Sequence, residues 1–194
     1  MLRRSHFIAL GIVAIVTALS AAAGYAYTLA AYHWHLNPVV IYLNPANHDV
    51  STTAAEAAVK VGMNAWNGKA HISYLYGGRV SDTATKIDGR NVVIFRNATN
   101  GSAVATTYSW SKSGARFDSD TVLWDGKYHF YTGTSGCSGG AYVEDISAHE
   151  LGHTLGLSHS TVTEATMYPT YHYCGTIMRT LASDDIAGLK KLYP

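Results

Sequence analysis

The apolar positions of this chain form short runs in its first two thirds and helix-spaced patterns toward its end. Short apolar runs rich in β-branched and aromatic residues indicate strands. We therefore expect strands at residues 39–43, 72–76, 91–95, 103–108 and 121–124. The chain has no internal repeat and no linker, so residues 24–194 are expected to form a single domain.

Three helices are predicted. The first begins at the capping-box pattern that Thr53 opens and ends near Gly68. The second spans residues 145–157, and the third begins at Ser183, which we expect to cap it. An irregular segment, 160–181, separates the last two helices. Strands followed by helices indicate the α+β class.

Residues 1–23 differ in character from the rest of the chain. Two arginines precede a nearly continuous apolar run, and three alanines follow it. This order is typical of a secretory signal peptide, with the alanines as the cleavage site. The alternative is an uncleaved membrane anchor. We therefore expect a secreted protein, or one anchored on the outer face of a membrane.

The charge of the chain excludes some partners. Removal of residues 1–23 takes two of the 14 basic residues and none of the 13 acidic ones, which leaves a formal charge of 12 − 13 = −1. A nearly neutral domain lacks the excess positive charge that binding to nucleic acid or to an anionic membrane surface requires.

The segment around residue 150 carries the chemistry. His149 and His153 are four residues apart, so on a helix their imidazoles share one face and can bind one metal ion. Gly156 allows the helix to end in a left-handed turn, after which His159 can supply a third nitrogen. Three histidines with one open position suit catalytic zinc. Glu150 then lies where a carboxylate can accept a proton from water.

This segment resembles the zinc helix of the metzincins. Ser160 directly after the third histidine resembles the matrixins, the matrix-metalloproteinase family. Met167 and its neighbours are similar to the matrixin methionine turn, and 183–193 resembles the start of its C-terminal helix. The resemblance covers roughly residues 34–194. It implies a metzincin-type catalytic domain: a twisted mixed β-sheet with a zinc helix, a methionine turn and a C-terminal helix.

The resemblance also implies roles for residues around the metal. Met167 would form an apolar floor beneath the histidines. Pro169 and Tyr171 would belong to the outer wall of the pocket for the residue after the cleaved bond, although Tyr171 could simply be packed surface. Residues 102–107 resemble the edge strand that pairs with an extended substrate.

Asp145 stands where many matrixins have an apolar residue at the base of that pocket. A carboxylate there would favour a basic or polar substrate side chain. The alternative is that Asp145 lies in the first helical turn and only interacts with the helix dipole.

The structural metal region of the matrixins is only partly present. Asp118 matches a calcium ligand, but Arg116 replaces a structural-zinc histidine and Thr121 replaces a calcium-binding glutamate. We therefore expect one catalytic zinc and no structural zinc. Calcium binding at Asp118 stays open, with a solvated loop as the alternative.

The chain has two cysteines, Cys137 and Cys174. An even pair in an exported protein usually forms a disulfide. The alternative is two free thiols, one of which could mask zinc.

These observations favour a secreted zinc endopeptidase that acts on protein or peptide substrates as a monomer. Two alternatives remain: a metzincin of another family with narrow substrate choice, and a secreted binding module that keeps a zinc site without turnover. Glu150 argues against the second alternative, because a module without turnover has no need of a base.

Overall fold

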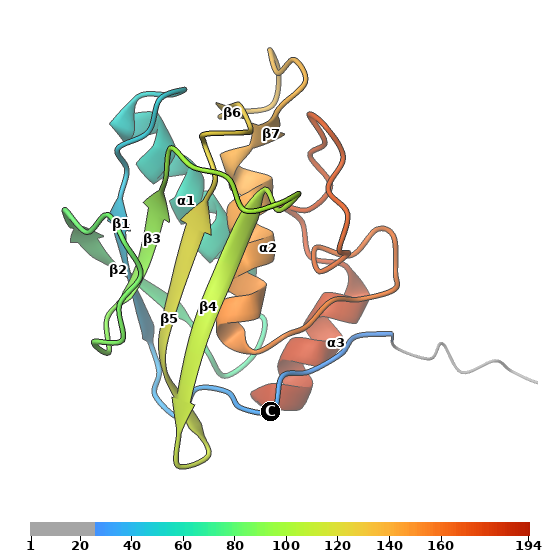
Figure 1. Cartoon of the computed structure of the whole chain (residues 1–194). Coiled ribbons are helices and arrows are strands. Elements are labelled where there is room, and N and C mark those ends of the chain that lie inside the picture. Colours follow the sequence, from blue (N-terminus) through green and yellow to red (C-terminus); the bar gives the residue numbers. More distant parts are fainter. Residues whose placement is uncertain (1–25) are drawn as a thin grey trace, which may run out of the picture.

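The computed structural model describes residues 26–194, so the predicted export segment, 1–23, lies outside the described residues. The described part of the chain has no helix that is both long enough and apolar enough to span a bilayer. Figure 1 shows one sheet with helices α1 and α2 packed on one of its faces, and α3 on the far side of α2. Strands and helices thus confirm the predicted α+β class with a mixed sheet.

The main sheet has the strand order β2-β1-β3-β5-β4. Its members are β1 Val39–Asn44, β2 Tyr74–Arg79, β3 Asn91–Phe95, β4 Ala105–Lys112 and β5 Ala115–Leu123. All neighbours run parallel except β4, which is antiparallel to β5 and forms one edge. Every residue of β3 is buried, because the sheet is covered on both faces. Two further short strands, β6 Phe130–Tyr131 and β7 Ala141–Tyr142, pair in parallel.

The strands at 39–43 and 91–95 were predicted closely, whereas the two that form the edge hairpin are longer than predicted. β4 continues to Lys112 and β5 begins at Ala115, joined by a tight turn in which Ser113 and Gly114 have positive φ. The predicted strand stopped at 108, where the apolar run ends and Ser109, Ser111 and Lys112 follow. In the hairpin, cross-strand pairs with β5 stabilise these polar residues as part of the strand.

The helices begin and end near the predicted residues, but their caps differ. In α1, Thr52–Trp66, the capping residue is Ser51 rather than Thr53, and its hydroxyl accepts from Ala54 N at 3.2 Å. In α3, Ser183–Leu192, Ser183 is the first helical residue and not the cap. The N-cap is Ala182, whose backbone N donates to the Asp185 carboxylate at 2.8 Å.

Helix α2, Val143–Leu155, crosses α1 at very short range. A Cβ atom on Gly62 of α1 would lie 2.7 Å from Ser147 Cβ and 2.8 Å from Ala148 N. Trp66, one turn further along α1, is buried and donates to Ala148 O at 2.9 Å. The position of α2 over the sheet therefore depends on the missing side chain of residue 62.

We expect Gly62→Ala to destabilise the protein by about 1–3 kcal/mol, the usual range for overpacking. Alanine is the better helix former, so a helix-propensity effect alone would raise stability instead. Chemical denaturation of the two proteins measures the difference. Val61→Ala, at an exposed position of the same helix, is the control and should change stability little. Equal stability of the Gly62 variant and the wild type would contradict the close contact.

Candidate metal centre and substrate cleft

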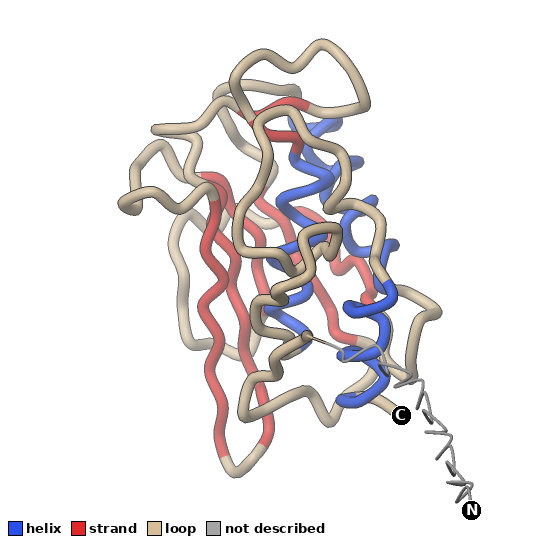
Figure 2. The backbone as a smooth tube through the Cα atoms, turned by 90° about the vertical axis from the view of Figure 1, so that its right-hand side faces the viewer, coloured by secondary structure: helices blue, strands red, loops and turns tan. Residues whose placement is uncertain are grey.

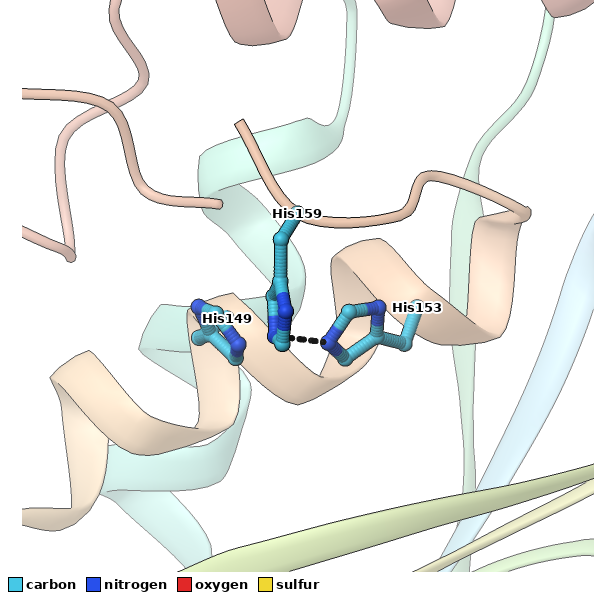
Figure 3. Close-up of side chains that lie close together, drawn as sticks. All are labelled: His149, His153 and His159. Atoms are coloured by element: carbon cyan, nitrogen blue, oxygen red, sulfur yellow. Dashed lines mark hydrogen bonds between the residues drawn. The ribbon is translucent and has the colours of Figure 1, made fainter. Parts of the chain in front are cut away.

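Three histidines from two segments converge beside the sheet. His149 and His153 lie on α2, and His159 lies on the irregular segment that follows the turn at Gly156 (Figure 3). Gly156 has φ 104°, the left-handed conformation that reverses the chain. Potential ligand atoms of the three histidines all lie within 4.8 Å of one another. They are the only such group of three or more among residues 26–194.

Backbone carbonyls orient two of the imidazole rings. His149 Nδ1 lies 2.7 Å from Thr166 O, and His153 Nδ1 lies 2.8 Å from Leu157 O. A carbonyl can only accept, so each Nδ1 carries the proton and each Nε2 keeps a lone pair. Burial lowers the pKa of His149 to about 3, and burial also lowers the pKa values of His153 and His159. The three rings are therefore neutral near pH 7.

The spacing of these nitrogens fits a shared tetrahedral metal ion. His153 Nε2 and His159 Nε2 lie 3.2 Å apart. Two nitrogens bound to zinc at the usual bond length and tetrahedral angle are about 3.3 Å apart. Neutral imidazoles with convergent lone pairs are ligands that zinc prefers, so the residues present fit this metal.

Glu150 lies beside the histidines and is 6% exposed. Thr107 on β4 donates its hydroxyl proton to Glu150 Oε2 at 2.6 Å. Burial raises the pKa of Glu150 to about 7, and the hydrogen bond from Thr107 opposes part of that shift.

The carboxyl end of α2 is held by side chains that the sequence did not single out for this purpose. Arg116 on β5 donates to the carbonyls of His153 and Thr154, the latter at 2.7 Å. Trp34 Nε1 also donates to Thr154 O, at 2.8 Å, and Tyr193 donates to Leu155 O at 2.6 Å. A buried cation at the negative end of a helix is electrostatically favourable. Arg116, where the family resemblance would lead us to expect a histidine, thus helps to hold the carboxyl end of α2.

Met167 is buried next to the zinc helix. A Cβ atom on Gly152 would lie 2.2 Å from Met167 Sδ, so this glycine makes room for the methionine. Asp185 of α3 accepts from Thr166 N at 2.8 Å and from Met167 N at 3.0 Å. The last helix therefore fixes the methionine turn through a buried carboxylate.

A cavity of about 780 Å³ opens in front of the histidines and Glu150. Its walls come from strand β4 and from the irregular segment after α2. Apolar or aromatic members of the lining include Val104, Ile146, Pro169, Tyr171, Tyr173 and Met178. Pro169 and Tyr171 both line this cavity, and their role in binding the residue after the cleaved bond stays a prediction.

Asp145 does not line this cavity. Its side chain is 3% exposed and pairs with Arg179, which donates through Nε to Oδ2 at 2.6 Å and through its backbone N to Oδ1 at 3.2 Å. Asp145 adjoins a second cavity of only about 10 Å³ behind Ile146 and Met178. The residue does lie in the first turn of α2, but its carboxylate is occupied by a partner from a distant loop.

A disulfide joins Cys137 to Cys174, with an S–S distance of 2.04 Å. Cys174 N also donates to Gly140 O at 2.8 Å. These contacts attach the loop that carries Tyr171 and Tyr173 to the segment that leads into α2. Neither cysteine is free.

Asp118 is fully buried, so the expected alternative of a solvated loop is wrong. Its Oδ2 accepts from Asp88 N and Gly89 N, both at 2.7 Å. The neighbouring Asp120 accepts from Lys86 N at 2.8 Å and Val92 N at 2.9 Å. Both carboxylates therefore hold the loop before β3 against the sheet.

Comparison with known proteins places these features in context. The family model described as Matrixin matches residues 33–194. Human matrix metalloproteinase-20 is 27% identical over 166 residues, covering 82% of this chain and 32% of its own length. The hatching enzyme of Paracentrotus lividus is 30% identical over 164 residues, covering 82% and 26%. Rat matrilysin is 40% identical over 79 residues, covering 41% and 26%. The chain spans no more than about a third of the length of these relatives.

We expect the protein to bind one zinc ion per chain and to lose it when a cluster histidine is replaced. His153→Asn removes one of three nitrogens, so the zinc content after dialysis should fall well below one per chain. Atomic absorption of the purified protein measures the content. His71→Asn changes an exposed histidine outside the cluster and should retain one zinc. Zinc bound equally by both variants would exclude the cluster as the site.

We expect Arg179→Met to cost about 3 kcal/mol at neutral pH, because it leaves the buried carboxylate of Asp145 without its partner. Burial already raises the pKa of Asp145, and loss of the arginine would raise it further. A folded-state pKa above the unfolded value means that protonation favours the folded state. The deficit should therefore shrink as the pH falls from 7 toward 4.

Urea denaturation at several pH values measures this dependence. The double variant Asp145→Leu/Arg179→Met has no buried charge at this site and should recover most of the stability. A deficit of the single variant that is independent of pH would contradict the role of the ion pair.

Proposed function

Because the chain belongs to the matrixin family of zinc metalloendopeptidases, we propose that it hydrolyses peptide bonds in extended protein segments. Membership in this family makes the alternative of another metzincin family wrong. The observation that carries the proposal is the position of Glu150, whose carboxylate lies beside three neutral histidines in the wall of a large cleft.

His149, His153 and His159 would hold the zinc ion. When bound, zinc polarises the scissile carbonyl and makes a water molecule more acidic. The carbonyls of Thr166 and Leu157 keep two of the imidazoles in the tautomer that can bind a metal.

Glu150 would act as the general base. It accepts a proton from the attacking water and passes it to the leaving amine, so the reaction needs no covalent intermediate. A base whose pKa lies near the working pH serves both steps well, and burial moves Glu150 in that direction.

An extended substrate would bind along the free edge of β4. In the described sheet this strand pairs only with β5, so its outer backbone groups are open to a peptide strand. The residue after the cleaved bond would enter the part of the cavity bounded by Pro169 and Tyr171. The apolar side chains of Ile146 and Met178 favour an apolar residue there.

Export and action as a monomer belong to the same proposal. The signal-like character of residues 1–23 and the disulfide support an oxidising destination outside the cell. The binding module without turnover remains the rival function, and one experiment separates the two.

We expect wild-type protein to digest casein and to stop when the zinc is chelated. Glu150→Gln should keep one zinc per chain and lose on the order of 10²-fold or more in kcat, the size expected for a positioned general base. Peptide cleavage followed by mass spectrometry measures both rates. The proposed mechanism is wrong if the wild-type protein binds zinc but cleaves nothing, or if the Glu150→Gln variant has full activity.

A further inference from the structure

Resting on the proposed function, we propose that Thr107 is a positioning residue for the general base: its hydroxyl holds one oxygen of Glu150 and leaves the other facing the cleft. The family resemblance assigns the residue only to the substrate-binding edge strand. The contacts of its side chain point to this second task.

The two carboxylate oxygens of Glu150 have different surroundings. Oε2 accepts the Thr107 hydroxyl proton at 2.6 Å. Oε1 accepts no hydrogen bond from residues 26–194, and no arginine, lysine or histidine of that part of the chain forms an ion pair with the carboxylate. Thr107 thus makes the one side-chain contact that selects an orientation of this carboxylate.

The hydroxyl of Thr107 has a single proton, and three oxygens lie near it. Glu150 Oε2 is the closest at 2.6 Å, Thr121 Oγ1 lies at 2.9 Å and Glu150 O at 3.1 Å. A carboxylate cannot donate and is the strongest acceptor of the three, so the proton goes to Oε2. Thr121 then donates its own proton to Thr107. The result is a series of hydrogen bonds in which Thr121 donates to Thr107 and Thr107 donates to Glu150.

Backbone pairing keeps the three side chains of this hydrogen-bond series in place. Thr107 and Thr121 are direct partners in the antiparallel pair of β4 and β5, and β4 also contacts α2. Both threonines lie on the sheet face that meets α2. Threonine has a restricted χ1, so its hydroxyl is held in place at little entropic cost. The longer glutamate loses more rotamer freedom, and the hydrogen bond offsets that loss.

The test compares side chains that differ only in the hydroxyl or only in the methyl group. Thr107→Val keeps the shape and removes the hydrogen bond, and we expect kcat to fall about tenfold with KM nearly unchanged. Thr107→Ser keeps the hydroxyl and should restore most of the rate. Ser119→Ala removes another hydroxyl from the same strand pair, one that does not contact Glu150, and should leave kcat and KM near wild type.

A second arm asks whether Thr107 acts through Glu150. In the Glu150→Gln background, Thr107→Val should change the residual kcat less than twofold, because the charged acceptor has gone. Zinc content and thermal unfolding are measured for each variant. If Thr107→Val fails to fold, Thr107→Ala is compared with Thr107→Ser in the same way.

The proposal is overturned if Thr107→Val matches the wild type, if Thr107→Ser is as slow as Thr107→Val, or if the loss persists in the Glu150→Gln background. Failure of the proposed function would give different results. If the wild type itself shows no peptidase activity, or if Glu150→Gln has the wild-type rate, the proposed function is wrong and the inference about Thr107 is wrong as well.

Discussion

The structure depends on holding three imidazoles close enough together to share one metal ion. His153 Nε2 and His159 Nε2 lie 3.2 Å apart, and the surrounding protein must supply this convergence. It does so with the turn at Gly156 and with the carbonyls of Thr166 and Leu157. A preformed ligand set of this kind lowers the ordering cost of binding a metal.

The same requirement explains why α2 is buried along almost its whole length. Every residue of this helix except His153 is buried, although its sequence contains acidic and polar side chains. Such burial is stable only when the polar groups find partners. Arg116, Trp34 and Tyr193 donate to backbone carbonyls at the carboxyl end, and Arg179 pairs with Asp145 at the amino end. Side chains from other parts of the chain thereby hold the helix at both ends.

The wall of the cleft opposite β4 has few regular elements, and specific cross-links take their place. The disulfide and the Asp145–Arg179 pair attach the segment after the methionine turn at two points to the region where α2 begins. Figure 2 shows this segment as a long loop beside α2 and α3. A loop without backbone ladders would otherwise be the most mobile part of a binding site. Its side chains can shape a pocket because the covalent and ionic links limit its motion.

Local patterns in the sequence determined much of the α+β fold. The histidine spacing and Gly156 act over neighbouring residues, and hydrophobic runs gave the strands at 39–43 and 91–95. The same local spacing marked His149, His153, His159 and Glu150 as a candidate site.

Only the tertiary structure decided which distant side chains meet. The sequence left Asp145 either at the base of a pocket or in the first helical turn, and Arg179, 34 residues away, could not be identified as its partner. Nor did the sequence indicate that Thr107 and Arg116 contact α2, which they reach only because β4, β5 and α2 pack together. Spacing along a chain specifies contacts within one turn or one strand. Contacts between elements depend on how the whole core packs, and no local pattern carries that information.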